Sequence, residues 1–301
     1  MTQIRTRLGR FLAASAGAFV AASLLAIGAP AGATVRGAAA IPRPPKDPAV
    51  AKLVPAATAK SGVVTYAMDA TYPPDEFVAA NGKTIVGMDA DLAVALSAVM
   101  GVKAKLENIT FDTIITGLQA GKFDVGNSSF TITSARAKVV NFVSYFQAGE
   151  GYYTKASSTL KLNGLASLCG KTVSVESGTT EQTDAQAQNT ACKKAKKAGV
   201  TVLGYNDQNQ ANLAVSSGRA QLGFSDSQVA AYIVKQSGGQ FKLNGSAFKV
   251  APYGLAFAKS TTLDKAVLAA MKVLMKDGIY AKILAKWGTQ TGSITNPRIV
   301  S

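Results

Sequence analysis

Along most of the chain, short runs of consecutive apolar residues alternate with longer segments in which apolar residues recur every three or four positions. The first pattern is typical of a buried strand and the second of an amphipathic helix. Residues 63–68 (VVTYAM) therefore predict a strand, and residues 89–100, with Leu92 and Leu96 on one side, predict a helix. Further strands are predicted at residues 102–106, 123–127, 171–175, 200–205, 221–225 and 255–257, and further helices at residues 112–120, 181–197, 210–217, 226–235, 263–275 and 278–287.

Alternating strands and helices are typical of parallel βαβ units, so the sequence predicts an α/β fold. A Ser/Thr/Asn-rich segment, residues 157–163, separates two similar sets of units. Two sets predict two lobes, with a ligand between them at the carboxyl ends of the strands. Residues 34–61 are rich in Pro and Ala and predict a linker, and residues 289–301 predict a polar tail.

The first 33 residues follow the order of an export signal. Three arginines within residues 1–10 precede an apolar run at residues 11–27, and Ala-Gly-Ala at residues 31–33 supplies the small residues of a cleavage site. The alternative is a membrane anchor, but the run is short for a span of roughly 20 residues. We therefore predict a signal peptide at residues 1–33 and an exported protein, periplasmic or extracellular, with no cysteine near the site for a lipid anchor.

Composition narrows the possible chemistry. The chain has 301 residues, of which 48% are hydrophobic and 16% charged, enough apolar material for sizeable cores. It contains no histidine, which excludes His-based triads, HExxH zinc sites and His-ligated haem. Two cysteines are too few for a four-thiolate metal site or an iron–sulfur cluster. We expect no metal and no cofactor.

Export to an oxidising compartment would allow the two cysteines to form a disulfide. In an oxidising compartment Cys169 and Cys192 are each other's only possible partners, which predicts a disulfide. Two free buried thiols are the alternative.

The formal net charge of +15 suggests a different class of function, adhesion to anionic wall polymer, membrane or nucleic acid. The lysines are scattered, however, apart from those within residues 193–197, and aromatic residues are not interleaved with them. That cluster is more simply a solvated helix face, so we expect no nucleic-acid partner.

A series of short segments resembles the polar amino-acid solute-binding proteins of ABC importers. The segments are DATYPP (69–74), GMDADLA (87–93), FDTII (111–115), GKFD (121–124), SSFTIT (128–133), RAKVVNF (136–142), GKTV (170–173), GTT (178–180), GRA (218–220) with Asp226, and YGLA (253–256). Their order and spacing fit the family from residue 63 to residue 287, nearly all of the part of the chain that is expected to be ordered.

The resemblance implies the type II periplasmic-binding-protein fold, in which two crossing strands join two α/β lobes and a hinge closes the cleft on its ligand. The first lobe is expected at residues 62–152 plus 253–288, and the second at residues 153–252. The implied partners are a free amino acid and an ABC transporter permease, and we expect a monomer.

An amino-acid receptor needs a cation for the ligand carboxylate, an anion for its ammonium group and a wall for its side chain. Arg136 follows a Ser/Thr-rich turn, where a guanidinium can grip a carboxylate in a bidentate pair, and the resemblance gives it that role. It gives Asp226 the ammonium group. It also implies contacts from Ser129, Thr131, Thr179 and Thr180 at the carboxylate, from Tyr72 and Phe111 as walls, and from Asp69 near the ligand side chain.

Other roles stay open for these residues at this stage. Arg136 can be a helix-surface arginine, Phe111 a core residue, and the Ser, Thr and Asp side chains can be helix caps. The sequence departs from the family pattern at Asp75, Glu181 and Gln221, which puts the detailed specificity in question.

Asp69, Asp75 and Glu181 would place surplus carboxylates around the pocket. Buried anions are costly unless they are paired, so these residues favour a basic ligand, namely arginine, lysine or ornithine. Glutamine or another polar amino acid is the alternative. A further alternative is an enzyme on the same scaffold, with Glu181 as its acid or base, but no histidine is present to assist it.

Overall fold

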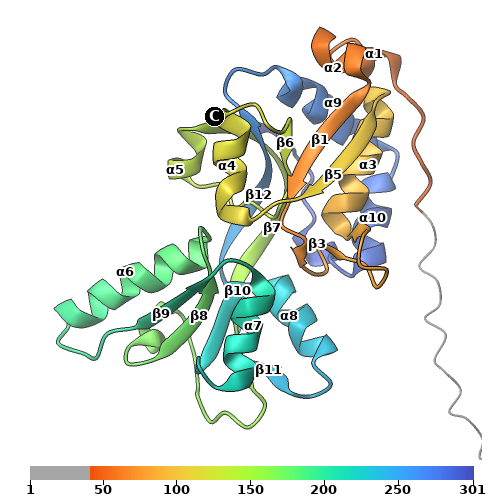
Figure 1. The fold of residues 1–301 in the computed structure, drawn as a ribbon. Coiled ribbons are helices and arrows are strands. Elements are labelled where there is room, and N and C mark those ends of the chain that lie inside the picture. Colours follow the sequence, from red (N-terminus) through yellow and green to blue (C-terminus); the bar gives the residue numbers. More distant parts are fainter. Residues whose placement is uncertain (1–40) are drawn as a thin grey trace, which may run out of the picture. The chain divides into compact units, whose positions relative to one another are not determined.

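The computed structural model describes residues 41–301 (Figure 1). A ten-stranded sheet contains the strands in the order β5-β1-β6-β12-β7-β10-β8-β9, with β11 and β13 also paired to β7. Its two long central strands, β7 (Val140–Lys155) and β12 (Phe248–Ala258), pair antiparallel with each other. Because β12 also pairs with β6 on one side and β7 with β10 on the other, the two strands cross between two lobes. The predicted two-lobed α/β fold is confirmed.

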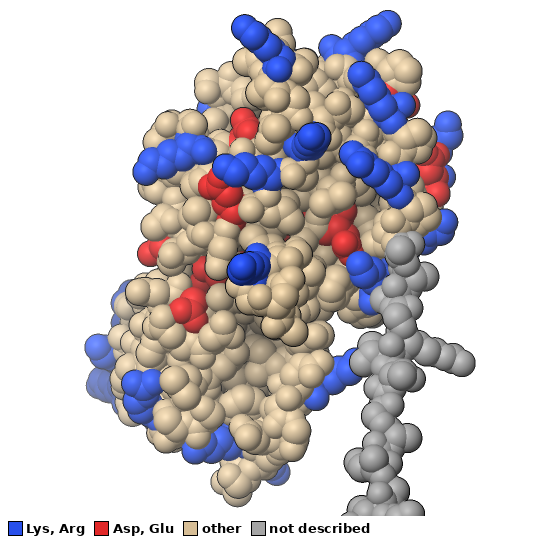
Figure 2. Space-filling view, turned by 45° about the vertical axis from the view of Figure 1, so that its right-hand side comes forward, with Lys and Arg blue, Asp and Glu red and all other residues tan. Residues whose placement is uncertain are grey.

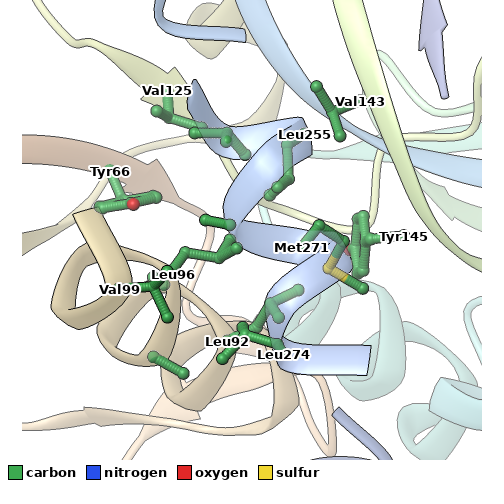
Figure 3. Packing of buried hydrophobic residues seen from close by; sticks show 14 of the residues in the cluster. Tyr66, Leu92, Leu96, Val99, Val125, Val143, Tyr145, Leu255, Met271 and Leu274 are labelled. Atoms are coloured by element: carbon green, nitrogen blue, oxygen red, sulfur yellow. The ribbon is translucent and has the colours of Figure 1, made fainter. Parts of the chain in front are cut away.

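The first lobe is built on parallel strands, with β1 (Val63–Met68) between β5 (Lys103–Asn108) and β6 (Val125–Gly126). Its helices are α3 (Met88–Met100), α4 (Phe111–Gln119), α5 (Ser134–Ala137), α9 (Leu263–Lys276) and α10 (Ile279–Trp287). Helix α3 ends at Gly101, whose left-handed backbone favours glycine. Leu92 and Leu96 of α3 and Met271 and Leu274 of α9 belong to one buried cluster (Figure 3), which fixes the helices on the sheet.

The second lobe repeats this arrangement. Strand β8 (Thr172–Glu176) lies between β9 (Thr201–Tyr205) and β10 (Leu222–Asp226), all parallel. The other elements of this lobe are α6 (Thr180–Lys194), α7 (Gln208–Ser217), α8 (Ser227–Gln236), the 3-10 helix η1 (Leu165–Leu168) and β11 (Phe241–Leu243). A disulfide joins Cys169 and Cys192, as predicted, with their Cα atoms 5.6 Å apart, and it fastens α6 to the segment that follows η1.

The carboxyl groups of Asp75, Glu76 and Asp89 are fully buried where a small sheet meets α3. This sheet consists of β2 (Thr71–Tyr72), β3 (Glu76–Val78) and β4 (Ile85–Val86). Ser129 contacts all three carboxyl groups. Its hydroxyl donates to Asp75 at 2.9 Å and to Glu76 at 3.5 Å, and its N–H donates to Asp89 at 3.2 Å. At Gly87 a Cβ atom would overlap the carbonyl of Asp75, so only glycine lets α3 approach the sheet this closely.

Two segments differ from their predictions. The expected linker does not hold over residues 48–61, which form α1 (Pro48–Ala51) and α2 (Ala56–Ser61), with Val50 and Val54 buried in the first-lobe core. The expected polar tail contains the 3-10 helix η2 (Gln290–Gly292) and β13 (Ile299–Val300), which pairs with β7. Both predictions rested on the average composition of the segment, which does not reveal a few apolar residues spaced so that they can be buried. The predicted signal peptide lies outside the described residues.

Within residues 41–301, no helix has both the length and the apolar character required to cross a bilayer.

The buried carboxyl cluster predicts a pH-dependent stability. Burial raises the pKa of Asp75 to about 6 and, together with the charge of Asp75, raises the pKa of Asp89 to about 8. The pKa of Glu76 is also raised, by burial and by its two neighbours. Since all three values exceed those of the unfolded chain, folding takes up protons, and the stability is lost as pH rises through these values. The thermal unfolding midpoint of the ligand-free protein should fall between pH 5 and pH 8.5.

Asp89→Asn removes one member of the cluster and should make this fall shallower, whereas Asp277→Asn at an exposed position should leave it unchanged. Midpoints that stay level or increase over this range in the unmodified protein would contradict the prediction.

The disulfide predicts a second effect on stability. The bond closes a loop with a sequence separation of 23 residues, which is worth about 3 kcal/mol in the chain-entropy account. A Cys169→Ser/Cys192→Ser protein should therefore unfold at a lower denaturant concentration, with a larger m-value because its unfolded chain is less restrained. Equal unfolding midpoints for the double variant and the oxidised protein would show that the bond contributes nothing.

Candidate functional site

A narrow cleft lies between the lobes, and residues of both lobes line it. Its first-lobe lining consists of Tyr72, Phe111, Ser129, Thr131 and Arg136. Its second-lobe lining consists of Glu176, Thr179, Thr180, Glu181, Gln208, Phe224, Ser225, Asp226 and Val229. Glu176 and Asp226 are the last residues of β8 and β10, and α6 and α8 begin just after them. The cleft therefore lies at the carboxyl ends of parallel strands, as the sequence predicted.

Arg136 is held in the cleft by contacts from both lobes. Its guanidinium donates to the carbonyl oxygen of Thr131 at 2.8 Å and to that of Gly178 in the second lobe at 2.9 Å. It also lies 5.3 Å and 5.4 Å from the ring centres of Phe111 and Phe130. These contacts orient the guanidinium in the cleft rather than on a free helix surface.

The charge of Arg136 is partly shielded from water. Burial lowers the pKa of Arg136, and the carboxylates of Glu181 and Asp226 oppose that shift. The short helix that carries Arg136 is capped by Thr133, whose side chain accepts the Arg136 N–H at 3.2 Å. The predicted alternative, in which Ser129 and Thr131 cap this helix, is therefore wrong.

The start of α6 forms the opposite wall. Thr179 caps the helix by accepting the Gln182 N–H at 3.2 Å, and its own hydroxyl donates to the Glu176 carbonyl at 2.8 Å. Capping is therefore one role of Thr179. Because the first N–H groups of a helix favour a negative charge, this wall also suits an anionic group. At Gly178 (φ +81°) a Cβ atom would lie 2.8 Å from the Asp112 Cβ, so glycine permits close contact between the lobes.

Three carboxyl groups face the same cleft. Glu176 is 1% exposed and neither of its carboxyl oxygens has a hydrogen-bond partner. Glu181 is 2% exposed and accepts only from the Thr180 hydroxyl, at 3.1 Å. Asp226 occupies the N-cap position of α8, but its side chain makes no capping bond, which removes the predicted alternative that it is an ordinary cap. The cleft is thus rich in acidic groups.

The pKa values of these groups are raised for the same reason. Burial raises the pKa of Glu176 to about 10, with the negative charge of Asp69 adding to the effect. Burial also raises the pKa of Glu181 and, together with the charge of Glu181, that of Asp226. A cation that entered the cleft would reverse these shifts. Among residues 41–301, no group of three or more Cys, Asp or Glu side chains is arranged to hold a metal ion.

Tyr72 and Phe111 form an aromatic wall. Their rings meet edge to face at 5.8 Å, and Phe111 also stacks on Phe130 at 4.6 Å. The Tyr72 hydroxyl is buried without a hydrogen-bond partner. Such a wall offers an apolar surface and one unsatisfied polar group.

Most of the residues singled out from the sequence line this cleft, but two do not. The Asp69 carboxylate is engaged inside the first lobe, where it accepts from the Thr71 hydroxyl at 2.7 Å and the Phe111 N–H at 3.0 Å. Asp75 belongs to the buried carboxyl cluster and also accepts from Gln228, at 2.7 Å. Ser129 lines the cleft, but its hydroxyl and its N–H are both donated to that cluster.

The sequence reasoning missed five lining residues: Glu176, Gln208, Phe224, Ser225 and Val229. Glu176 had a detectable signal, because it directly follows the predicted strand at residues 171–175 and so stands at a carboxyl end. The other four residues had no such signal, because their sequence surroundings are those of ordinary strand and helix positions.

The chain is similar to known proteins over this whole region. A profile of the family described as "Bacterial extracellular solute-binding proteins, family 3" matches residues 64–290. The arginine-binding protein ArgT of Corynebacterium glutamicum is 31% identical over 250 residues, 83% of this chain and 82% of that protein.

Two solved structures of ancestral proteins are also similar. An ancestral arginine-binding protein bound to arginine is 36% identical with a TM-score of 0.69, covering 75% of this chain and 98% of that one. An ancestral arginine-binding protein bound to glutamine is 35% identical with the same TM-score, covering 76% and 98%.

Proposed function

This chain belongs to the bacterial extracellular solute-binding proteins of family 3, and we propose that it is an exported receptor for a free polar amino acid, with a basic one preferred. In this proposal it delivers the ligand to an ABC permease. The observation that carries the proposal is the charge pattern of the cleft, whose lining combines Arg136 with three carboxyl groups, the buried Glu176 and Glu181 and the partly exposed Asp226.

Each charged group of a free amino acid has a matching partner in this proposal. The ligand carboxylate pairs with Arg136 beside Thr131, and the start of α6 at Thr179 and Thr180 supports the same end. The ammonium group pairs with Asp226, whose carboxylate is free of capping bonds. Tyr72 and Phe111 enclose the side chain. Ser129 supports the site by holding the carboxyl cluster behind it.

The surplus of carboxyl groups favours a cationic side chain. Arg136 and Asp226 suffice for the two charged groups shared by all amino acids, which leaves two further buried carboxyl groups, Glu176 and Glu181. A cationic side chain can pair with one of them in its ionised form, whereas a neutral ligand gains no ion pair there. Glutamine is the alternative ligand. Both ligands occur among similar proteins, since ArgT is named for arginine and one ancestral structure is bound to glutamine.

Binding without catalysis is the simpler account of the site. Glu181 could act as a general acid or base, but no histidine is present to assist it, and the relatives that match most of the chain are named as binding proteins. Adhesion through surface charge is also less favoured, since Figure 2 shows Lys and Arg side chains spread over the face rather than gathered in one patch.

We further propose that the cleft opens and closes about β7 and β12. Residues 62–152 with 253–288 would move as one lobe and residues 153–252 as the other. The protein would be a monomer whose signal peptide is removed on export. A ligand that contacts both lobes favours the closed form, because its carboxylate and ammonium partners come from different lobes.

Titration calorimetry with the twenty amino acids, ornithine and citrulline tests the function. A cationic amino acid should bind in a saturable one-to-one manner and should raise the unfolding temperature as its concentration increases. Tight binding of glutamine or glutamate, with no heat from arginine, lysine or ornithine, would overturn the preference for a basic ligand.

Arg136→Ala tests the carboxylate partner. Loss of the guanidinium leaves the ligand carboxylate buried and unpaired, so affinity should fall by about 100-fold or more for every amino acid that binds. The matched control is Arg219→Ala, an exposed arginine outside the cleft lining, which should bind as the unmodified protein does. A folded Arg136→Ala protein of unchanged affinity would refute the assignment.

A further inference from the structure

We propose that a contact between the small sheet and α8, outside the ligand cleft, holds the two lobes closed and thereby sets the affinity of the receptor. Two residue pairs form this closure contact, Asp75 with Gln228 and Phe77 with Tyr232. The inference rests on the proposed function and adds to it residues that act on binding without touching the amino acid.

The closure contact joins elements of different lobes (Figure 1). Asp75 and Phe77 belong to the first lobe, directly before and within β3, whereas Gln228 and Tyr232 lie on α8 of the second lobe. The Gln228 amide donates to the Asp75 carboxylate at 2.7 Å, and the centres of the Phe77 and Tyr232 rings are 6.1 Å apart, as in aromatic pairs. Because residues four positions apart share one face of a helix, α8 presents both side chains to the small sheet together.

The four residues of the closure contact do not line the cleft, although α8 also carries residues that do. Asp226, just before α8, and Val229 line the cleft, while Gln228 and Tyr232 line a separate groove together with Trp287 of the first lobe. The same helix thus carries cleft residues on one side and the closure contact on another. A movement of α8 therefore affects both.

Gln228 also connects the closure contact to the crossing strands. Its side-chain nitrogen carries two hydrogens, and besides the bond to Asp75 it donates to the Tyr253 hydroxyl of β12 at 2.8 Å. The pairing of β12 with β7 is irregular between Tyr253 and Gly254. One side chain therefore fastens α8 both to the small sheet and to the strand about which the lobes would turn.

Asp75 is a position at which the sequence departs from the pattern of the solute-binding proteins, and it does not line the cleft. One of its oxygens accepts from Gln228 and also from the hydroxyl of Ser129, which does line the cleft. The bond across the lobes thus gives a role in binding to a buried carboxyl group that the ligand site leaves unused.

The closure contact belongs to the closed arrangement of the lobes, because it occurs together with the bond from Arg136 to the Gly178 carbonyl across the cleft. Rotation of the second lobe away from the first separates α8 from β3 and breaks both pairs. An amino acid whose two ends bind different lobes needs the closed form, so its apparent affinity falls in proportion to the fraction of receptor that is closed. Contacts that favour closure therefore raise the affinity from outside the site.

Gln228→Ala and Tyr232→Ala each remove one pair. With L-arginine as the probe, or L-glutamine if calorimetry favours it, each variant should bind about fivefold more weakly than the unmodified full-length protein, and the double variant about 50-fold more weakly. Trp287, the single tryptophan of the chain, lies 5.7 Å from the Phe77 ring and provides a fluorescence signal for stopped-flow kinetics. The loss should appear as faster dissociation, with the association rate changed by less than about threefold.

Three further variants separate the contact from general damage to α8. Gln236→Ala, at the exposed end of the helix, is the matched control and should leave the affinity and both rates unchanged. Tyr232→Phe restores the ring and should recover the affinity that Tyr232→Ala loses. Gln228→Glu sets two carboxyl groups against each other, and adding Asp75→Asn exchanges the donor and the acceptor of the bond, so the pair should recover most of what Gln228→Glu loses.

Small-angle scattering of the ligand-free proteins gives a readout that needs no bound amino acid. The Gln228→Ala/Tyr232→Ala protein should have a larger radius of gyration than the unmodified protein. Equal radii, or a double variant that binds and releases the probe as the unmodified protein does, would overturn the role of the closure contact. If none of the amino acids binds the unmodified protein, the proposed function itself fails, and the two radii alone decide whether the contact holds the lobes closed.

Discussion

The antiparallel pairing of β7 with β12 is the constraint on which the other parts of this molecule depend. The pair extends from Val140–Ala258 at one end to Glu150–Phe248 at the other, and it is irregular at two places along the way. Each lobe attaches its own parallel strands to this pair, β6 to β12 and β10 to β7. The cleft exists because the strand ends of the two lobes face each other across it.

Buried carboxyl groups occur at two places, in a cluster beside α3 and in the cleft between the lobes, and their surroundings differ. Asp75, Glu76 and Asp89 are joined by Ser129, and the Tyr145 hydroxyl also donates to Asp89, at 2.7 Å. In that cluster, donors of the protein itself offset part of the cost of burial. Glu181 in the cleft accepts from the Thr180 hydroxyl and keeps one oxygen without a donor, so a cationic ligand can offset part of the cost of its burial. One set of carboxyl groups therefore holds the small sheet against α3, and the other lines the cleft.

The sequence predicted the elements whose periodicity is strong and missed those that depend on long-range pairing. The alternation of strands and helices was enough for the α/β fold, whereas the resemblance to the solute-binding proteins was needed to assign Arg136, Thr179 and Asp226 to the cleft. Val50 and Val54 could not be assigned, because two apolar residues in a Pro/Ala-rich segment become core residues only once α3 and α9 lie beside them. For Asp69 and Asp75 the residue type alone could not reveal that donors from other segments occupy their oxygens.

Contacts between the lobes involve the same segments as the proposed site. Arg136 donates to the Gly178 carbonyl across the cleft, and the Gln208 N–H donates to the Thr71 hydroxyl at 3.2 Å. That hydroxyl in turn donates to Asp69, which holds Phe111. A ligand that draws on Arg136 and Phe111 therefore acts on groups that already span the two lobes. In the proposed closure, ligand recognition and lobe movement would be coupled, since Arg136 and Phe111 belong to the proposed site and also take part in the contacts between the lobes or support them.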